Sequence, residues 1–581
     1  MSQMRRREFL LWSAAAVGTI GLAACQSAAP AAPTVAAAAK SATSPVAAAT
    51  AAPTAAGTAA KPTSPPAAAT APALGAAASS GGTLIYGLSG DLDDTLDPQV
   101  TNYDTTIRVT LNVCEPLVWE PEPGKFVPGL AESWDISSDA TIYTFRLKKG
   151  VVFHDGTPFN GAAVKFTFDR VIDPVTKAGQ SHDQLGPYDH TEVVDDYTIK
   201  VVMKQPYAAL LTNLNGYLGI VSPTAVQKMG LAEFARHPVG TGPFLFKEWV
   251  PKDHVSLVKN PDYNWGSSFF QHAGPAYLDG VTYKIIPEPS VRTGTLKTGE
   301  THIIDEVDPL EYAALSKDPK FGIIMKGQPG SGWILMLNTS STGAIVDPAV
   351  RQAMEYAIDR EGVNTSVFQG LNKAAWSPLM RPTFAYDAST EQVYSFDPEK
   401  AKQVLDTAGW SPSANGIRAR GSQRLEISFP IISRPRDKAM AESVQASLRD
   451  VGIDLQVDPL ERAAARDAYN QNRYDVAFMW FSYGDPDVLR TLFHSANINA
   501  FNRSRYQVPE VDKMLEDAAG LTDLTKRTDL YKQIQQRVLK DTATVPLVDT
   551  IVYNAKRAEV QGETLDALAS YVWLNDVQLK K

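Results

Sequence analysis

The sequence predicts an α/β protein, because strand and helix patterns alternate through residues 82–581 and one stretch matches a β-α-β unit. In that stretch, the strand Leu425–Ile432 is followed by the helix Lys438–Asp450 and the strand Ile453–Val457, with Gly452 before the last strand. The hydrophobic content of 44% and charged content of 20% are ordinary for a globular chain. At 581 residues the chain has room for several domains.

The first part of this body is rich in strand patterns. Thr83–Leu88 is an apolar opening strand, and Thr141–Lys148 alternates polar and apolar residues. Val151–Gly156 is expected to continue that strand into a turn. Apolar residues then recur at helical spacing over Ala162–Val171, and Tyr197–Met203 has the pattern of another half-buried strand.

The second part carries clearer helix signals. Asp347-Pro348 and Asp397-Pro398 each place an N-cap residue before a proline at the first helical position. Gly409 is placed to end the second of these helices. The helix Glu461–Asn472 is expected to lead into a strand, and Val511–Lys540 reads as one long helix. The strand after Asn472 is expected at residues 474–481.

The first 24 residues have the composition of an export signal. A basic start that includes Arg6 and Arg7 runs into about 15 apolar residues, which is short for a bilayer span. The paired arginines followed by Phe-Leu resemble a twin-arginine signal. Leu22-Ala-Ala-Cys25 resembles a bacterial lipobox, which implies lipidation at Cys25; the alternative is a simple secretory signal.

Residues 25–81 are predicted to be a disordered tether between that anchor and the folded body. Residues 26–80 contain 26 Ala and 8 Pro but no aromatic and no acidic residue. Such a segment has nothing large to bury, and its prolines interrupt helix formation. We therefore expect the tether to hold the body away from a membrane.

Several function classes are disfavoured. Residues 81–581 carry 50 basic and 63 acidic residues, which argues against nucleic acid as a partner. No phosphate-binding loop, zinc-protease motif or C-x-x-C occurs, and the eight histidines are dispersed. The sequence therefore indicates no catalytic residue, no metal site and no cofactor. Cys114 lies in an apolar stretch and is expected to be a buried hydrophobe.

Aromatic residues are the most distinctive feature of the later sequence. Trp333, Trp376, Trp480 and Tyr483 lie in or beside expected loops. Each ring could belong to the core or line a ligand cleft, and the pattern alone leaves both open.

An ordered set of motifs resembles bacterial solute-binding proteins of ABC transporters, family 5, which includes oligopeptide-, dipeptide- and nickel-binding members. The motifs run in family order from about residue 84 to about residue 550, so they cover the whole body. They are Thr95-Leu-Asp-Pro98, Glu115-Pro-Leu117, Leu130-Ala-Glu-Ser-Trp134, Tyr143-Thr-Phe145, Phe153-His-Asp-Gly156-Thr-Pro158, Phe168-Asp-Arg170, Pro238-Val-Gly-Thr-Gly242-Pro-Phe244, Asn260-Pro-Asp-Tyr263, Val350-Arg-Gln-Ala353, Ala357-Ile-Asp-Arg360 and Tyr474-Asp-Val with Asp485-Pro486.

The resemblance implies a type 2 periplasmic-binding-protein fold, with two lobes joined by two crossovers and an extra inserted domain. Lobe I is expected from residues 82–116, 239–332 and 546–581, the inserted domain from 117–238, and lobe II from 333–545. Ligand would lie between the lobes, which close around it by hinge motion.

The implied function is capture of a small, peptide-like solute by a non-enzymatic, monomeric protein that delivers it to an ABC permease. The chain would stand on the outer face of the cell membrane, held by its lipid. The resemblance implies a ligand site that includes the following residues: Tyr103, Trp333, Asn338, Trp480, Tyr483 and Asp485. A sugar, an opine-like conjugate or a metal chelate of nickel type are alternative solutes. A hydrolase, or a surface sensor or chaperone-like protein on the same fold, is an alternative function.

One position departs from the pattern of the family's peptide binders. Those members hold the ligand's amine with an aspartate just before a Gly-Asp-Pro turn, and alignment on this turn places Ser482 there. A neutral hydroxyl cannot supply the ion pair that a buried ammonium needs. Asp485 or Asp487 could take that role, or both could simply belong to the turn.

Overall fold

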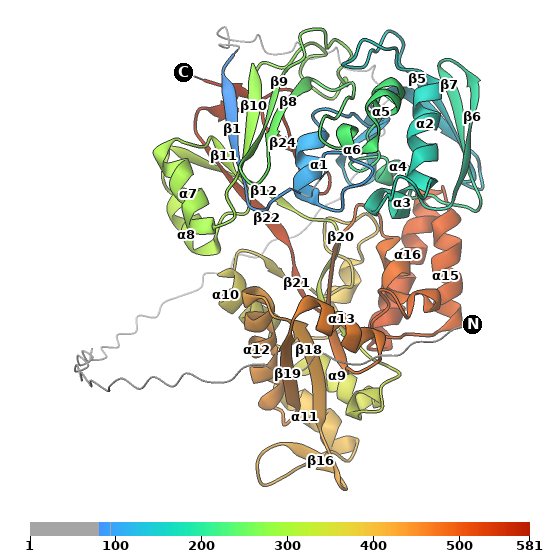
Figure 1. Cartoon of the computed structure of the whole chain (residues 1–581). Helices are drawn as coiled ribbons and strands as arrows, with labels where there is room; N and C mark the ends of the chain where they lie inside the picture. Colours follow the sequence, from blue (N-terminus) through green and yellow to red (C-terminus); the bar gives the residue numbers. More distant parts are fainter. Residues whose placement is uncertain (1–80, 93–94, 581) are drawn as a thin grey trace, which may run out of the picture. The chain divides into compact units, whose positions relative to one another are not determined.

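The structure, a computed structural model, describes residues 81–92 and 95–580. The predicted export signal with Arg6, Arg7 and Cys25, and nearly all of the predicted tether, lie outside the described residues. The three largest sheets of the described part are one in each of two lobes and a third beside them (Figure 1), and five sheets of two or three strands complete the set. Among the described residues, no helix combines the length and apolarity needed to cross a membrane.

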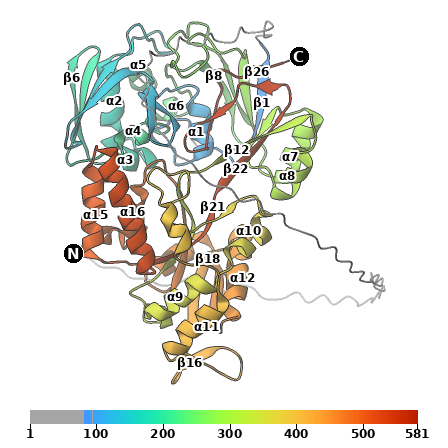
Figure 2. The same ribbon diagram turned by 180° about the vertical axis from the view of Figure 1, so that it is seen from behind.

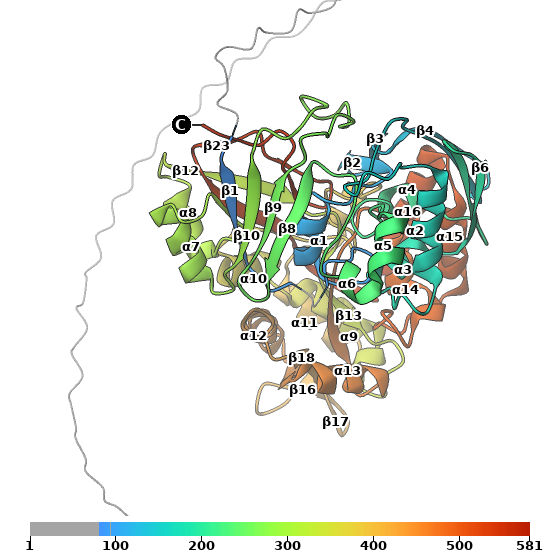
Figure 3. The same cartoon turned by 45° about the horizontal axis from the view of Figure 1, so that its top comes forward.

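Lobe I is built on a mixed seven-stranded sheet. Its strands, in spatial order, are β12 (Phe321–Gly327), β22 (Ile551–Arg557), β11 (Ile303–Ile304), β1 (Thr83–Leu88), β10 (Gly280–Ile285), β9 (His254–Lys259) and β8 (Phe244–Val250). The neighbouring strands β1, β10, β9 and β8 are seen side by side in Figure 3, with α7 (Pro289–Thr298) and α8 (Pro309–Leu315) at one side. The opening strand β1 has the bounds that the sequence predicts. It stands in the middle of the sheet and is paired in parallel with β10 on one side and β11 on the other.

The inserted segment forms its own layer. Its antiparallel sheet has the order β4 (Ala131–Ile136), β5 (Ile142–Leu147), β7 (Thr198–Met203) and β6 (Tyr188–Asp195). The helix α2 (Gly161–Ile172) packs on this sheet and begins at Asn160, whose side chain accepts a hydrogen bond from Ala163 N–H. Val151–Gly156 does not extend β5 as expected. It makes only the isolated bridge Val152–Pro158, because Asp155 accepts hydrogen bonds that fold the chain into a turn.

Lobe II carries the second large sheet, whose order is β14 (Lys373–Ala374), β21 (Thr544–Asp549), β13 (Gly330–Leu337) and β20 (Val476–Ser482). Beside β20 lies the parallel pair β18 (Glu426–Ile432) and β19 (Asp454–Leu460), connected by α12 (Pro435–Arg449). This confirms the predicted β-α-β unit. Met440, Ala441, Val444 and Leu448 of α12 are fully buried in the lobe II core, which is why the helix covers these strands.

Helix caps in lobe II follow the sequence signals. Asp347 accepts a hydrogen bond from Ala349 N–H at the start of α9 (Pro348–Ala357). Asp397 caps α11 (Pro398–Thr407) in the same way, and Gly409 follows it with a φ of 83° that favours glycine. The remaining helices of this lobe are α10 (Arg360–Phe368), α13 (Arg462–Asn470), α14 (Val488–Phe493), α15 (Pro509–Gly520) and α16 (Leu524–Lys540).

The expected long helix over Val511–Lys540 is instead two helices, α15 and α16, which lie side by side in Figures 1 and 2. The break falls at residues 521–523. Asp523 caps the second helix by accepting from Thr525 and Lys526 N–H, so the chain restarts its helix there.

The chain crosses between the two large sheets twice. The first crossover lies between β12 and β13, at residues 328–329, and the second is Thr550, between β21 and β22. The two crossovers are bonded to each other, since Gln328 N–H donates to the Thr550 carbonyl at 2.9 Å. Strand β13 begins at Gly330 and β21 ends at Asp549, a few residues away from the expected lobe limits of 332 and 546. The division into lobes by residue stays a prediction.

Candidate functional site

The carboxyl ends of three lobe II strands meet at one edge. Strands β18 and β19 are parallel, and β20 follows the same direction, because Ser428 is bonded to Asp475 at one end and Phe429 contacts Phe478 further along. The ends of β18, β19 and β20 are therefore neighbours, with the first turns of α12 and α13 directly after two of them. Ligands in α/β proteins bind at such carboxyl edges, so we take this as the candidate site.

Two tryptophans from neighbouring strands form the apolar part of the site. Trp333 of β13 and Trp480 of β20 stack with ring centroids 6.1 Å apart and an interplanar angle of 18°. Trp333 is buried and Trp480 half-buried. The structure thus brings together two of the predicted site residues, and both rings also border the lobe II core.

Trp480 also touches the crossover. Its indole Nε1–H donates to Thr550 Oγ1 at 2.9 Å. Thr550 is the single residue that separates β21 of lobe II from β22 of lobe I. A solute that contacts the Trp480 ring is therefore linked by one hydrogen bond to Thr550, where the chain passes between the lobes.

Tyr483 follows directly after β20 but reaches away from the tryptophan pair. Its backbone N–H donates to the Pro329 carbonyl in the first crossover, at 3.2 Å. Its hydroxyl accepts from Asn213 Nδ2 at 3.0 Å, so it joins lobe II to the inserted segment. Burial raises the pKa of this hydroxyl well above its usual value, which keeps it protonated.

Asp485 is a buried member of an ion pair. Its two carboxylate oxygens accept from the two terminal nitrogens of Arg527, each at 2.7 Å. The pair borders a cavity of about 250 Å³ between the inserted segment and lobe II. Apolar side chains that include Phe126, Trp134 and Leu521 line the same cavity.

Asn338 lies at the opposite end of the lobe II sheet. It follows the last residue of β13, and its Nδ2 donates to Asn472 Oδ1 and to the Tyr474 carbonyl, each at 2.8 Å. Gly330 at the other end of β13 pairs with Ser482, so along the strand Asn338 is about 25 Å from that end and about 17 Å from Trp333. The structure does not bring Asn338 together with the tryptophans.

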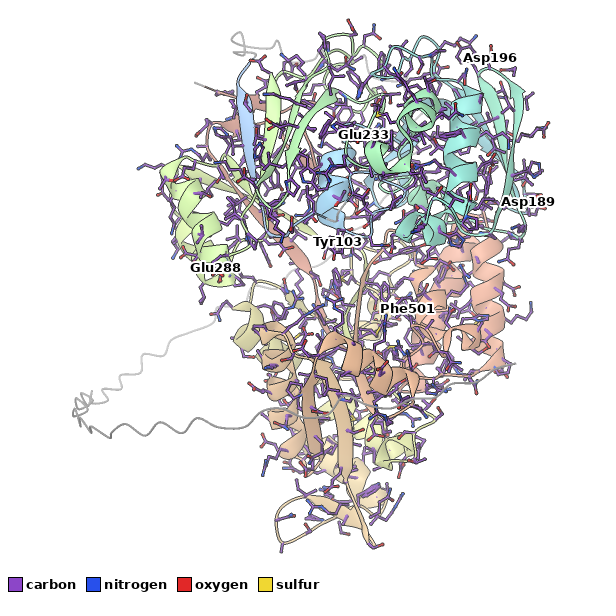
Figure 4. The ribbon with its side chains drawn as sticks, viewed as in Figure 1. Tyr103, Asp189, Asp196, Glu233, Glu288 and Phe501 are labelled. Atoms are coloured by element: carbon purple, nitrogen blue, oxygen red, sulfur yellow. The ribbon has the colours of Figure 1, made fainter. Side chains whose placement is uncertain are left out.

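Tyr103 comes from lobe I, where it precedes α1 (Asp104–Thr110). Its side chain is 52% exposed. Figure 4 shows Tyr103 on the edge of lobe I nearer to lobe II, and Phe501, which is 44% exposed, on the lobe II edge nearer to lobe I. Phe501 itself packs against Phe481 of β20, with ring centroids 5.1 Å apart.

Sequence reasoning missed the charged residues of the site. Arg434 and Arg436 lie at the start of α12, Arg462 begins α13, and Asp437 lies in the first turn of α12. The guanidinium of Arg436 lies 4.7 Å from the ring centroid of Trp333. The β-α-β pattern already contained the signal, because residues after strand ends face the carboxyl edge of a sheet.

Electrostatics at this edge are unbalanced. Burial is the main cause that lowers the pKa of Arg436 from its ordinary value, even though Asp437 and Glu306 oppose it. Burial likewise raises the pKa of Asp437, against the effect of Arg436, Arg434 and Arg462. Among residues 81–92 and 95–580, no cluster of three or more His, Cys, Asp or Glu is arranged to hold a metal ion.

Comparison with known proteins defines the class first: residues 125–500 match the model of bacterial extracellular solute-binding proteins, family 5 Middle. The glutathione-binding protein GsiB of Pectobacterium atrosepticum is 30% identical over 486 residues, which cover 81% of this chain and 90% of that protein. The chain belongs to the bacterial extracellular solute-binding proteins of family 5.

Solved structures agree in fold. One is the ABC transporter-associated periplasmic binding protein DppA from Helicobacter pylori in complex with the peptide STSA. It has a TM-score of 0.69 and 29% identity, and the match covers 86% of this chain and 98% of that one. Another is NikA from Brucella suis in complex with Fe(III)-EDTA, with a TM-score of 0.74, 27% identity, and coverage of 85% and 100%. The fold is therefore that of type 2 periplasmic binding proteins, as the sequence predicts.

Proposed function

We propose that this protein is the lipid-anchored, extracytoplasmic solute-binding component of an ABC importer and captures a peptide-like solute between its lobes. The observation that supports this most is the Trp333–Trp480 pair at the carboxyl edge of lobe II. Flat rings provide large apolar contacts for a small solute. The bond from Trp480 to Thr550 connects that contact to a crossover, so binding and lobe closure are coupled.

The comparisons support the substrate class and the partner. One relative is named for glutathione, and the DppA structure contains a four-residue peptide. The DppA protein is also described as ABC transporter-associated. A peptide-like solute and an ABC permease are accordingly our proposals for this chain.

Ligand-dependent stabilisation tests this function. The full chain, purified in detergent, is screened by thermal unfolding against di- to pentapeptides, glutathione and sugars. A solute at about 100-fold its dissociation constant adds about 2.7 kcal/mol to the free energy of unfolding. We expect a hit among the peptide-like solutes, and its affinity should fall in the Trp480→Ala variant. A library without any hit contradicts the proposal.

A metal chelate is the second candidate, because the NikA structure contains Fe(III)-EDTA and an arginine lies over Trp333 in this protein. A chelate would bind as cargo through its organic part. Elemental analysis of the purified chain, and thermal unfolding with Fe(III)-EDTA and with a nickel–histidine complex, separate this solute class from peptides.

We propose the division that the resemblance implies: lobe I from about 82–116, 239–332 and 546–581, the inserted domain from about 117–238, and lobe II from about 333–545. We place the exact lobe limits a few residues away, at the crossovers, and propose that the protein is a monomer. The crossovers near residues 328–329 and 550 would then act as the hinge. Small-angle scattering with and without a bound solute checks this. The radius of gyration should fall on binding while the mass stays that of one chain. An unchanged radius contradicts hinge closure.

We propose that Cys25 carries the lipid and that Arg6 and Arg7 direct export. The supporting observation is the apolar stretch that ends at Cys25 after a basic start. The Cys25→Ser variant should move from the membrane fraction to the soluble fraction, and Arg6→Lys with Arg7→Lys should block export. The single variant Lys40→Gln, in the predicted tether, is the control. A Cys25→Ser protein that stays in membranes contradicts the anchor.

A further inference from the structure

The inference concerns the charge of the solute and rests on the proposed function. Three arginines stand at the carboxyl edge of lobe II: Arg434, Arg436 and Arg462. None of the three guanidinium groups makes a hydrogen bond or an ion pair with any residue that the structure describes. Other arginines of this lobe are bonded: Arg360 pairs with Glu355, and Arg527 pairs with Asp485.

Arg436 is held in place without being neutralised. Its guanidinium lies over the buried ring of Trp333, and the packing around it lowers its pKa. The side chain of Arg436 is exposed, so its N–H groups are open to a solute, and its place over the Trp333 ring fixes where an anion would bind. The planar guanidinium presents parallel N–H donors that match a carboxylate.

Acidic side chains near the end of β20 are already committed. Asp485 is paired with Arg527, and Asp487 with Arg490. Ser482, which shares a face of β20 with Trp480, contributes only a neutral hydroxyl, whose oxygen has no hydrogen-bond partner among the described residues. No carboxylate at the end of this strand is left to receive an ammonium group.

Two acids remain at this edge: the buried Asp437 and the exposed Glu461, which precedes Arg462. Asp437 is the one close to all three arginines. It is 4% exposed, and its Oδ1 has no hydrogen-bond partner in the described part of the chain. The positive charges of Arg434, Arg436 and Arg462 act on the Asp437 carboxyl. The same charges would repel an ammonium group of a ligand at this place. With Arg434, Arg436 and Arg462 against Asp437 and Glu461, arginines outnumber acids at this edge of lobe II.

We infer that the solute is anionic: a carboxylate of the solute binds Arg436 beside the Trp333–Trp480 pair, with Arg434 and Arg462 next to it, and recognition requires no free amine. This assigns a charge class to the solute that the proposed function leaves open. It covers acidic or amine-blocked peptides, organic acids and anionic chelates, which share the chemistry of an exposed carboxylate.

The test compares matched solutes on the full chain in detergent by isothermal titration. The probes are glutathione, the tetrapeptide Ser-Thr-Ser-Ala, citrate and Fe(III)-EDTA. Glutathione and the tetrapeptide are used as such, with a blocked amine, and with amidated or esterified carboxyls. We expect the amine-blocked forms to bind as well as the parent compounds, and the carboxyl-blocked forms to bind at least about tenfold more weakly.

Single substitutions test which side chain binds the carboxylate of the solute. Arg436→Gln should lower the affinity for the tightest-binding acidic probe by about tenfold or more. The affinity of Arg436→Lys should lie between that of Arg436→Gln and that of the parent, because lysine keeps the charge but loses the bidentate geometry. Arg449→Gln, an exposed arginine at the other end of α12, is the matched control. Ser482→Asp should lower the affinity for the acidic probes and raise the affinity for probes with a free amine. Ser482→Ala should change neither affinity in this way. Unfolding of each variant without solute shows whether it is folded.

Two results would overturn the inference while leaving the proposed function intact. One is binding that survives amidation of the carboxyls but is lost on blocking the amine. The other is an Arg436→Gln protein, folded as well as the control, that keeps its full affinity for the acids. Failure of every solute in the wider library contradicts the proposed function, and the inference falls with it.

Discussion

Asp485 illustrates at the residue scale how a partner distant in sequence sets the role of a side chain. Asp485-Pro486 is a turn signal in the sequence, and Arg527 lies 42 positions later. In the fold the two form a buried, bidentate ion pair that borders the cavity between lobe II and the inserted segment. The sequence names the acid but not the base that neutralises it.

Breaking this pair should destabilise the protein. Asp485→Asn leaves the guanidinium of Arg527 buried without its counter-ion, which costs about 3–5 kcal/mol. Urea denaturation measures the loss. The control is Lys513→Gln, which removes the exposed pair with Asp517 on α15 and should cost about 1 kcal/mol or less. Equal stability of the two variants would contradict a structural role for Asp485.

At the element scale, the crossovers carry the connection between site and hinge. Thr550 receives Gln328 N–H on its carbonyl and the Trp480 indole on its hydroxyl. Tyr483 N–H is bonded to Pro329 in the other crossover. The end of β20 is thus bonded to both segments that join the lobes.

Removing the indole–threonine bond tests this connection. Trp480→Phe keeps an aromatic ring but lacks the N–H donor, and Thr550→Val removes the acceptor. Each variant should weaken solute binding several-fold, and the double variant should be no weaker than either single one, because the same bond is lost. Isothermal titration of the parent, the two single variants and the double variant measures the affinities for this double-mutant cycle. Additive losses would show that the two residues act independently. Thr528→Val, a half-buried threonine on α16 whose hydroxyl donates only to the Leu524 carbonyl of its own helix, is the control.

At the scale of the whole molecule, buried carboxyls make stability depend on pH. Burial raises the pKa of Glu120 to about 8, with the nearby Asp485 and Asp566 acting in the same direction. Burial also raises the pKa of Glu115 to about 7 and that of Glu355 to about 7. Between their ordinary values and these raised values, the folded chain binds more protons than the unfolded chain. The free energy of unfolding therefore falls as pH rises through this window.

Glu120→Gln should flatten that dependence, because glutamine stays neutral throughout. From pH 5 to pH 8 the parent should lose stability relative to the variant, by at most about 1.4 kcal/mol per pH unit. Denaturation at several pH values measures the difference. Glu132→Gln, at an exposed position of β4, should follow the parent. A constant difference between parent and Glu120→Gln would mean that Glu120 does not titrate in this range.

Much of the local structure could be predicted because its causes lie within a few residues. The caps at Asp347 and Asp397 and the alternation of β5 follow from neighbouring side chains. The parallel β18–β19 pair follows from the order strand, helix, strand along the chain. The break between α15 and α16 was missed because polar and apolar spacing continues across it, and the cap at Asp523 was not recognised.

The candidate site could be predicted only in part. The sequence indicates Trp333 and Trp480 as amphipathic rings beside loops that could line a ligand cleft. The pairing of β13 with β20 brings the two rings together. The family resemblance implies Asn338 as a site residue, yet Asn338 follows the far end of β13 and the length of this strand separates it from the rings. Arg434 and Arg436 carry no motif of their own, and only their place directly after β18 in the β-α-β unit points to the site.

By itself, the sequence determined the family, the α/β class and most helix caps, because ordered motifs and side chains at fixed spacing act locally along the chain. Only the tertiary structure decided which charges distant in sequence are paired: Arg527 is paired with Asp485, and Arg436 with no acid among the described residues. The reason is physical: an ion pair depends on distance and burial, and residues far apart in sequence acquire both only when strands and helices pack.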